Sequence, residues 1–241
     1  MTTTTALPTG ATGTNPIKAL NDFGQSPWMD YIRRDLLTSG GLKRMIDSDG
    51  LRGMTSNPTI FEKAITGGTY YSDITESPDA KKLDAKGVYE KIAIRDVQDA
   101  TDIFKGVYAE TKQRDGYVSL EVSPLLANNT QGTIDEARRL WKSVNRPNVM
   151  IKVPATPAGI PAIRQLLEDG ININITLLFA QSAYEQVAEA FLSALEARAK
   201  KGEDISKIAS VASFFVSRID TLIDGQIEEQ LKTERDGSKK A

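Results

Sequence analysis

The fold is decided by residues 148–178, which read NVMIKVPATPAGIPAIRQLLEDGININITLL. Two short apolar runs, Val149–Val153 and Ile171–Leu178, flank a stretch of helical periodicity that follows Pro157 and ends at Gly170. Short apolar runs that alternate with helical stretches are typical of βα units, in which neighbouring strands are parallel. Gly170 favours a helix end because glycine tolerates the left-handed conformation needed there. The segment therefore predicts a strand, a helix and a second strand in succession.

The same alternation continues in both directions along the chain. We predict further strands at Pro27–Ile32, Leu51–Thr55, Tyr117–Val122 and Ile208–Ser213. Six strands of this kind, without a clean linker between them, predict one α/β domain over residues 15–241. The Thr-rich residues 1–14 before it are predicted to be a disordered tail. A closed (β/α)₈ barrel has eight strands in typically about 250 residues, so the predicted set is two strands short.

Local sequence marks the starts of several helices. Thr133-Ile-Asp-Glu136 and Ser182-Ala-Tyr-Glu185 fit the capping box, in which a hydroxyl and a carboxylate each satisfy a backbone N–H. Asn57-Pro58 and Thr156-Pro157 place a capping side chain before a proline at the first helical position. The polar stretch Thr69–Gly87 is expected on the surface.

Composition excludes several kinds of chemistry. The 241 residues include neither Cys nor His, which excludes disulfides, cysteine nucleophiles, the Ser-His-Asp triad and zinc sites built on these ligands. The general acids and bases of any catalytic site must then be carboxylates, Lys, Tyr or water. A net charge of −2 argues against nucleic-acid and anionic-membrane partners. Because no apolar run could span a bilayer and the N-terminus lacks a signal sequence, we expect a cytoplasmic protein.

Three ionisable residues lie in predicted strands: Lys152, Glu121 and Asp30. Lys152 shares a strand face with Met150. It is either a strand-end lysine that reaches solvent or a desolvated amine, which would be a Schiff-base nucleophile for a carbonyl. A carboxylate in an apolar strand is costly unless it is paired, so each acid is at an outward or edge position, paired with an arginine, or part of a site. Their occurrence in three strands of one domain favours a shared site.

Polar residues also follow or end the strands. Asn172 and Asn174 alternate with Ile, and Thr176 continues their face, which is either exposed to solvent or part of a barrel interior. Asn57 is a substrate contact or simply a helix cap. Ser213 and Arg218 flank a predicted helix N-terminus, where they could seat a phosphate, although Arg218 could equally be a surface residue.

Taken together, these segments resemble the transaldolases, in particular their longer bacterial branch, from about Asn15 to the end of the chain. The motifs that carry the resemblance are GQSPWMD (24–30), GMTSNPTIF (53–61), VSLEVS (118–123), VMIKVPAT (149–156), GININITLLF (170–179) and ASVASFFVSRID (209–220).

The resemblance implies a (β/α)₈ barrel, with six of its strands in this chain, and an enzyme without metal or cofactor. It implies transfer of a dihydroxyacetone unit from sedoheptulose 7-phosphate to glyceraldehyde 3-phosphate, giving erythrose 4-phosphate and fructose 6-phosphate in the pentose phosphate pathway. Lys152 matches the Schiff-base lysine and Asp30 the acid–base aspartate. Glu121 matches a glutamate that acts through a water, which Thr176 would help to hold.

The resemblance also implies the substrate contacts. Asn57 and Asn174 match asparagines that contact the bound donor, Ser213 and Arg218 match part of the sugar-phosphate seat, and Phe215 matches a wall of the pocket.

Family members of this branch continue beyond residue 241 with two more strands and another phosphate-binding arginine, and some relatives carry a fused isomerase. Two alternatives to a transaldolase therefore stay open. One is a lysine-dependent aldolase that releases free dihydroxyacetone. The other is an inactive truncated barrel, or a non-catalytic sugar-phosphate binder. The oligomeric state is not predicted.

Overall fold

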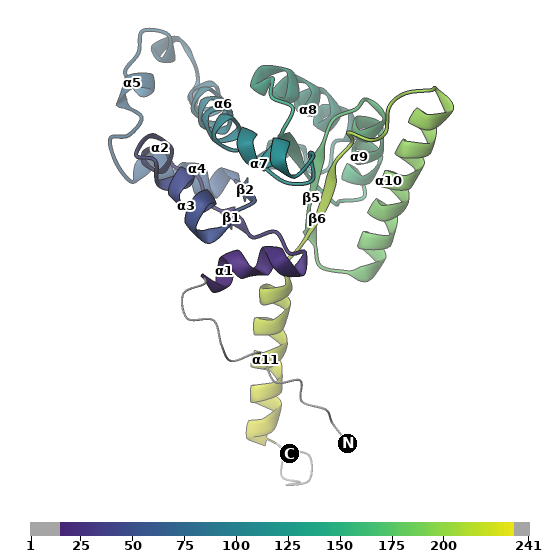
Figure 1. Cartoon of the computed structure of the whole chain (residues 1–241). Helices are drawn as coiled ribbons and strands as arrows, with labels where there is room; N and C mark the ends of the chain where they lie inside the picture. The colour runs from purple at the N-terminus through teal and green to yellow at the C-terminus, as the bar shows by residue number, and fades with distance from the viewer. Residues whose placement is uncertain (1–14, 234–241) are drawn as a thin grey trace. The chain divides into compact units, whose positions relative to one another are not determined.

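A computed structural model describes residues 15–233 of the chain (Figure 1). The predicted tail at 1–14 lies outside the described residues. The described residues group into two compact units, one formed by 15–118 with 146–148 and the other by 119–145 with 149–233. No helix within residues 15–233 is both long and apolar enough to cross a membrane.

The first unit contains the beginning of a parallel sheet and the helices that follow its strands. Strand β1 (Trp28–Asp30) pairs with β2 (Gly53–Thr55), which pairs with the start of β3 (Tyr117–Glu121). Gly53 is the register partner of Trp28, and any side chain at Gly53 would overlap the indole ring. The helices are α1 (Pro16–Ala19), α2 (Arg34–Thr38), α3 (Gly41–Asp49), α4 (Pro58–Thr66), α5 (Ser72–Thr75), α6 (Ala85–Ile103) and α7 (Lys105–Glu110), with 3₁₀ turns η1 (Leu20–Phe23) and η2 (Ala80–Lys82).

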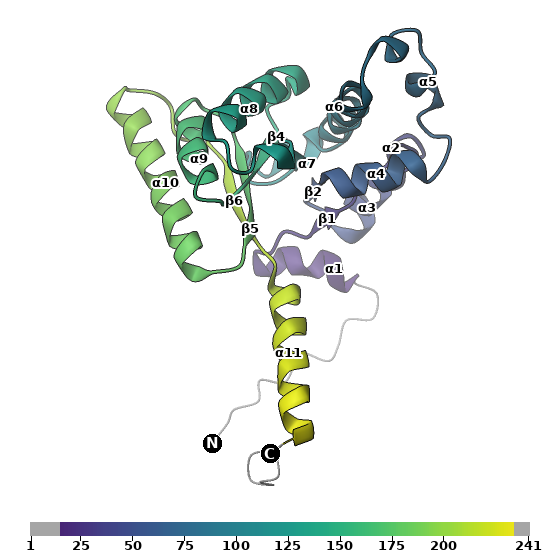
Figure 2. The same cartoon turned by 180° about the vertical axis from the view of Figure 1, so that it is seen from behind.

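The second unit continues the sheet and covers it with helices. Helices α8 and α9 contact β4, while α9 and α10 contact β5 and pack on each other (Figure 2). The strands are the end of β3, β4 (Val149–Pro154), β5 (Ile173–Leu178) and β6 (Ser210–Phe214). The helices are α8 (Thr130–Val144), α9 (Gly159–Glu168), α10 (Gln181–Lys200) and α11 (Val216–Thr233), with the 3₁₀ turn η3 (Pro124–Leu126).

The strands follow one another in the sheet in chain order, from β1 to β6. The β1–β2, β2–β3, β4–β5 and β5–β6 pairs are parallel. All six predicted strands are confirmed, and the ends of each differ from the prediction by at most two residues. Parallel strands in chain order, with helices between them, are the arrangement of the first six βα units of a (β/α)₈ barrel. The predicted fold class is therefore confirmed.

One of the predicted helix starts before a proline is confirmed, and the other is shifted. The Asn57 side chain accepts the N–H of Ile60 at 3.0 Å and so caps α4. The Thr156 hydroxyl accepts the N–H of Gly159, but α9 begins only at Gly159 and its N-cap residue is Ala158, so the predicted start at Pro157 is two residues too early. The predicted end of this helix is also confirmed, since Gly170 has a φ of 87°.

Both predicted capping boxes are wrong. Helix α8 begins one turn earlier than Thr133, because the Asn129 side chain already accepts the N–H of Gly132. Glu136 instead accepts the N–H of Ser123, just after β3, at 2.6 Å. Helix α10 begins at Gln181 without any side-chain cap, so Ser182 lies inside its first turn.

The predicted surface segment Thr69–Gly87 contributes to a buried polar cluster in the first unit. The Tyr71 hydroxyl donates to Asp96 at 2.8 Å and accepts the N–H of Arg34 at 3.1 Å. Arg34 in turn donates to Asp96 through Nε at 2.7 Å. Asp96 is fully buried and Tyr71 is 2% exposed. Burial raises the pKa of both groups above their ordinary values, and the two hydrogen bonds to Asp96 oppose the rise for its carboxyl.

Replacing Asp96 with Asn should lower the free energy of unfolding by about 3 kcal/mol, because the Arg34 guanidinium would lose its buried charged partner and keep only the exposed Asp73, at 3.4 Å. Urea denaturation measures the change. Asp99→Asn is the matched control on the same helix, since Asp99 pairs with Arg95 at the surface, where such a pair contributes at most about 1 kcal/mol. Equal losses in the two variants would show that the buried cluster is not a special source of stability.

Candidate active site

Lys152 and Glu121 face each other on one side of the second unit's sheet. The Lys152 amine lies 3.3 Å from a Glu121 carboxylate oxygen, and the two side chains are only 8% and 14% exposed. Their strands are neighbours, since the Val122 N–H donates to the Lys152 carbonyl at 3.1 Å. The lysine amine is therefore held inside the unit beside a carboxylate rather than extended into solvent.

Asn174 connects this pair to two further strands. It is the register partner of Lys152 in the parallel β4–β5 pair, so the two side chains leave the sheet on the same face. The Asn174 amide donates to the Ser119 hydroxyl at 3.0 Å, and its carbonyl oxygen accepts from the Ser213 hydroxyl at 2.8 Å. We call Ser119, Glu121, Lys152, Asn174 and Ser213 the polar face.

The hydrogen bond between Ser119 and Asn174 shows that the polar face is concave. Ser119 is on β3 and Asn174 is on β5, and β4 separates the two strands. Strands two apart in a flat sheet would be about 9–10 Å apart. A bond of 3.0 Å between their side chains therefore requires the sheet of the second unit to curve toward this face, as in a barrel interior.

Strand β5 is buried on both of its sides from Ile173 to Thr176, and Leu177 near its end is exposed. Asn174 and Thr176 are each 1% exposed, while Ile173 and Ile175, on the opposite side, are also buried. The solvent-exposed alternative for the polar side of this strand is thus wrong. Asn172, just before the strand, has a structural role: its amide donates to the Val149 carbonyl at 3.3 Å and its oxygen accepts from the N–H of Ala209 at 3.0 Å.

Aromatic and cationic side chains meet at the carboxyl ends of β5 and β6. The rings of Phe179 and Phe215 are stacked, with centroids 5.2 Å apart. The Arg218 guanidinium lies 4.2 Å from the centroid of Phe215. Arg218 is exposed in the first turn of α11, and Ser213 is half-buried near the end of β6. We call Phe179, Phe215 and Arg218 the aromatic stack.

Asp30 and Asn57 belong to the first unit. Asp30 is the last residue of β1, its register partner is Thr55 at the end of β2, and its side chain is exposed. Asn57 follows β2 and is half-buried as the cap of α4. Both are therefore at the carboxyl ends of parallel strands, the side of an α/β sheet on which catalytic residues are found.

Sequence reasoning missed two members of these groups. Ser119 lies two residues before Glu121 on the same strand, and this spacing puts both side chains on one face. This two-residue spacing could therefore have identified Ser119 from the sequence. Phe179 lies after the end of β5, where neither strand nor helix periodicity predicts the direction of a side chain.

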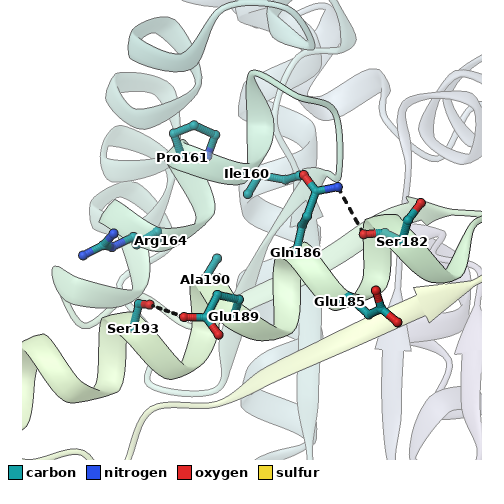
Figure 3. A pocket seen from close by; sticks show the side chains of 9 residues that line it. All are labelled: Ile160, Pro161, Arg164, Ser182, Glu185, Gln186, Glu189, Ala190 and Ser193. Atoms are coloured by element: carbon teal, nitrogen blue, oxygen red, sulfur yellow. Dashed lines mark hydrogen bonds between the residues drawn. The ribbon is translucent and has the colours of Figure 1, made fainter.

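One described groove lies elsewhere in the second unit, between α9 and α10 (Figure 3). It has a volume of about 620 Å³, and none of the predicted site residues lines it. Some of its polar side chains form hydrogen bonds within α10, since Gln186 donates to the Ser182 carbonyl and Ser193 donates to Glu189, each at 3.1 Å. In the described part of the chain, no three acidic side chains gather as a metal site.

Residues 27–241 match the family described as Transaldolase/Fructose-6-phosphate aldolase.

Curated relatives of the chain are named transaldolases. The chain is 50% identical to the transaldolase of Trichodesmium erythraeum over 95% of its length and 60% of that protein. It is 46% identical to transaldolase 2 of Nostoc sp. over 90% of its length and 57% of that protein, and 43% identical to the transaldolase of Thiobacillus denitrificans over 88% and 59%. The chain thus spans about three-fifths of the length of these relatives.

Proposed function

Because the chain belongs to the transaldolase/fructose-6-phosphate aldolase family, we propose that its polar face transfers a dihydroxyacetone unit between sugar phosphates through a Schiff base on Lys152. The supporting observation is the buried lysine amine 3.3 Å from the Glu121 carboxylate. An amine held in place beside a proton acceptor has what imine formation needs, a nucleophile and a base. The activity, substrates and pathway of the whole protein are part of the proposal.

In this mechanism the Lys152 amine attacks the C2 carbonyl of a ketose phosphate such as fructose 6-phosphate. Glu121 accepts a proton from the amine and, through a water, returns one to the departing hydroxyl, so that the carbinolamine loses water and becomes an imine. The protonated imine accepts the electron pair of the C3–C4 bond when that bond breaks. Asp30 takes the proton of the C4 hydroxyl, and the aldose phosphate leaves.

The dihydroxyacetone unit then stays on Lys152 as an enamine until a second aldose phosphate accepts it. Asn174 is suited to holding the donor, because its hydrogen bonds to Ser119 and Ser213 fix the orientation of its amide. We assign Asn57 to the donor as well, and Thr176 to the water that Glu121 uses.

The phosphate group of the sugar is assigned to Ser213 and Arg218, with Phe215 as the wall beside it. An arginine and a hydroxyl near the start of a long helix provide charged and neutral donors for a phosphate. The stacking of Arg218 on Phe215 supports this assignment, since it restricts the guanidinium to one side of the ring.

An exchange experiment tests the proposal and separates it from the aldolase alternative. The chain, alone and joined to the part of the Trichodesmium protein that it does not match, is incubated with fructose 6-phosphate and erythrose 4-phosphate. The proposal predicts sedoheptulose 7-phosphate by mass spectrometry. Free dihydroxyacetone without transfer would favour the lysine-dependent aldolase, and absence of both products from the joined protein would favour a non-catalytic binder.

A further inference from the structure

Phe179 has no role in the mechanism above, yet it is part of the aromatic stack. Its ring is nearly parallel to that of Phe215, with 14° between the two planes and 5.2 Å between the centroids. Phe179 is 46% exposed, so burial alone does not explain its position. The backbone brings the two rings together, since the Phe215 N–H donates to the carbonyl of Leu178, the residue just before Phe179.

The stack restricts Arg218. An exposed arginine side chain has many rotamers, and a guanidinium that must receive a phosphate has to be held in a few of them. Attraction between the cation and the Phe215 ring favours the rotamers in which the guanidinium lies over that ring. The Phe215 ring is half-buried, and its stacking on Phe179 favours the orientation that faces Arg218.

We propose that Phe179 is a positioning residue that acts through Phe215 on Arg218 and strengthens the binding of a substrate's phosphate group. The proposal rests on the proposed function, which gives Arg218 the phosphate contact. Phe179 touches no reacting atom, so its effect belongs to phosphate affinity and not to imine chemistry.

The test compares a ligand that has a phosphate with one that has none. Phe179→Ala should weaken binding of inorganic phosphate, measured by titration calorimetry, by about 3- to 10-fold, the loss expected from one aromatic contact. Borohydride trapping of free dihydroxyacetone on Lys152 should keep its rate. Phe179→Tyr preserves the ring and should restore phosphate binding to the level of the unmodified protein.

Two controls show whether the effect passes through the stack. Tyr184 is 44% exposed, and its ring contacts that of Phe214, with centroids 5.4 Å apart, and not that of Phe215. Tyr184→Ala should therefore leave phosphate binding unchanged. In an Arg218→Ala background, Phe179→Ala should cause no further loss, because the group that it positions is gone. The melting temperature of each variant identifies any loss of folding.

Failure of this proposal is distinguishable from failure of the proposed function. Phosphate binding does not need an imine, so the titrations are repeated in Lys152→Arg protein. Unchanged phosphate affinity in Phe179→Ala, equal losses for phosphate and dihydroxyacetone, or the same loss with and without Arg218 would each overturn the proposal. Absence of phosphate binding by the unmodified protein would overturn it as well.

Discussion

Lys152→Arg is expected to reduce transfer activity to background, a loss of at least about 10⁴-fold, as for other deleted nucleophiles. A guanidinium stays protonated and cannot form the imine with the C2 carbonyl. The substitution keeps a positive charge beside Glu121, 3.3 Å from the present amine, so the fold should be disturbed little. Activity is measured by the exchange of fructose 6-phosphate and erythrose 4-phosphate described above.

Lys142→Arg is the matched control, because Lys142 lies exposed on α8 of the same unit. Its activity should equal that of the unmodified protein. Retention of more than a few per cent of activity by Lys152→Arg, in protein that melts at the usual temperature, would show that another group is the nucleophile.

The two carboxylates should affect different steps of the reaction. Asp30→Ala should slow turnover by about 10²–10⁴-fold, the usual contribution of a general acid or base, while imine formation continues because the C4 proton is removed only afterwards. Glu121→Gln should slow imine formation itself by a similar factor, since the amide cannot accept the proton of the lysine amine. Single-turnover trapping and steady-state exchange, measured on the same samples, separate the two steps.

Asp47→Ala serves as the control for loss of a carboxylate. Asp47 is exposed on α3, where its carboxylate pairs with its helical neighbour Lys43, and its loss should leave both rates within a factor of two. Should Asp30→Ala and Glu121→Gln also stay within a few-fold of the unmodified protein, the two carboxylates would be structural, and the acid–base assignments would be wrong.

Most of the fold follows from local pattern. Strand β4 is an uninterrupted apolar run around Lys152, and β5 alternates Asn with Ile, because both faces of these strands are covered. Gly170 marks the end of α9 because its backbone angle is one that few other residues adopt. These features depend on residues close together in the chain, so the sequence is sufficient to predict them.

Partners from distant segments could not be predicted in the same way. Glu136 has the spacing of a capping box, but its carboxylate binds the backbone of Ser123 beyond the helix. Tyr71 lies in a polar segment but is buried in a hydrophobic cluster with Ala64 and Ile92, where Arg34 and Asp96, from two other helices, provide the hydrogen bonds of its hydroxyl. In each case the partner is fixed by packing, which local periodicity does not encode.

Part of the candidate site could be predicted, because the order of the strands indicates which side chains lie near one another. Glu121, Lys152 and Asn174 occupy three consecutive strands at equivalent depth, so the βα pattern predicts that they meet at one end of the sheet. The curvature that brings Ser119 to Asn174, and the stacking of Phe179 on Phe215, depend on how the strands and loops pack. Neither the curvature nor the stacking produces a pattern in the local sequence from which it could be predicted.

The central claim is that Lys152 forms a Schiff base with a ketose phosphate, and borohydride reduction tests it most directly. The protein is incubated with fructose 6-phosphate, reduced, digested, and its peptides are weighed by mass spectrometry. The account predicts a three-carbon dihydroxyacetone adduct on the peptide containing Lys152, and none in Lys152→Arg protein. An adduct on another lysine, or no adduct in protein joined to the remaining part of a relative, would contradict it.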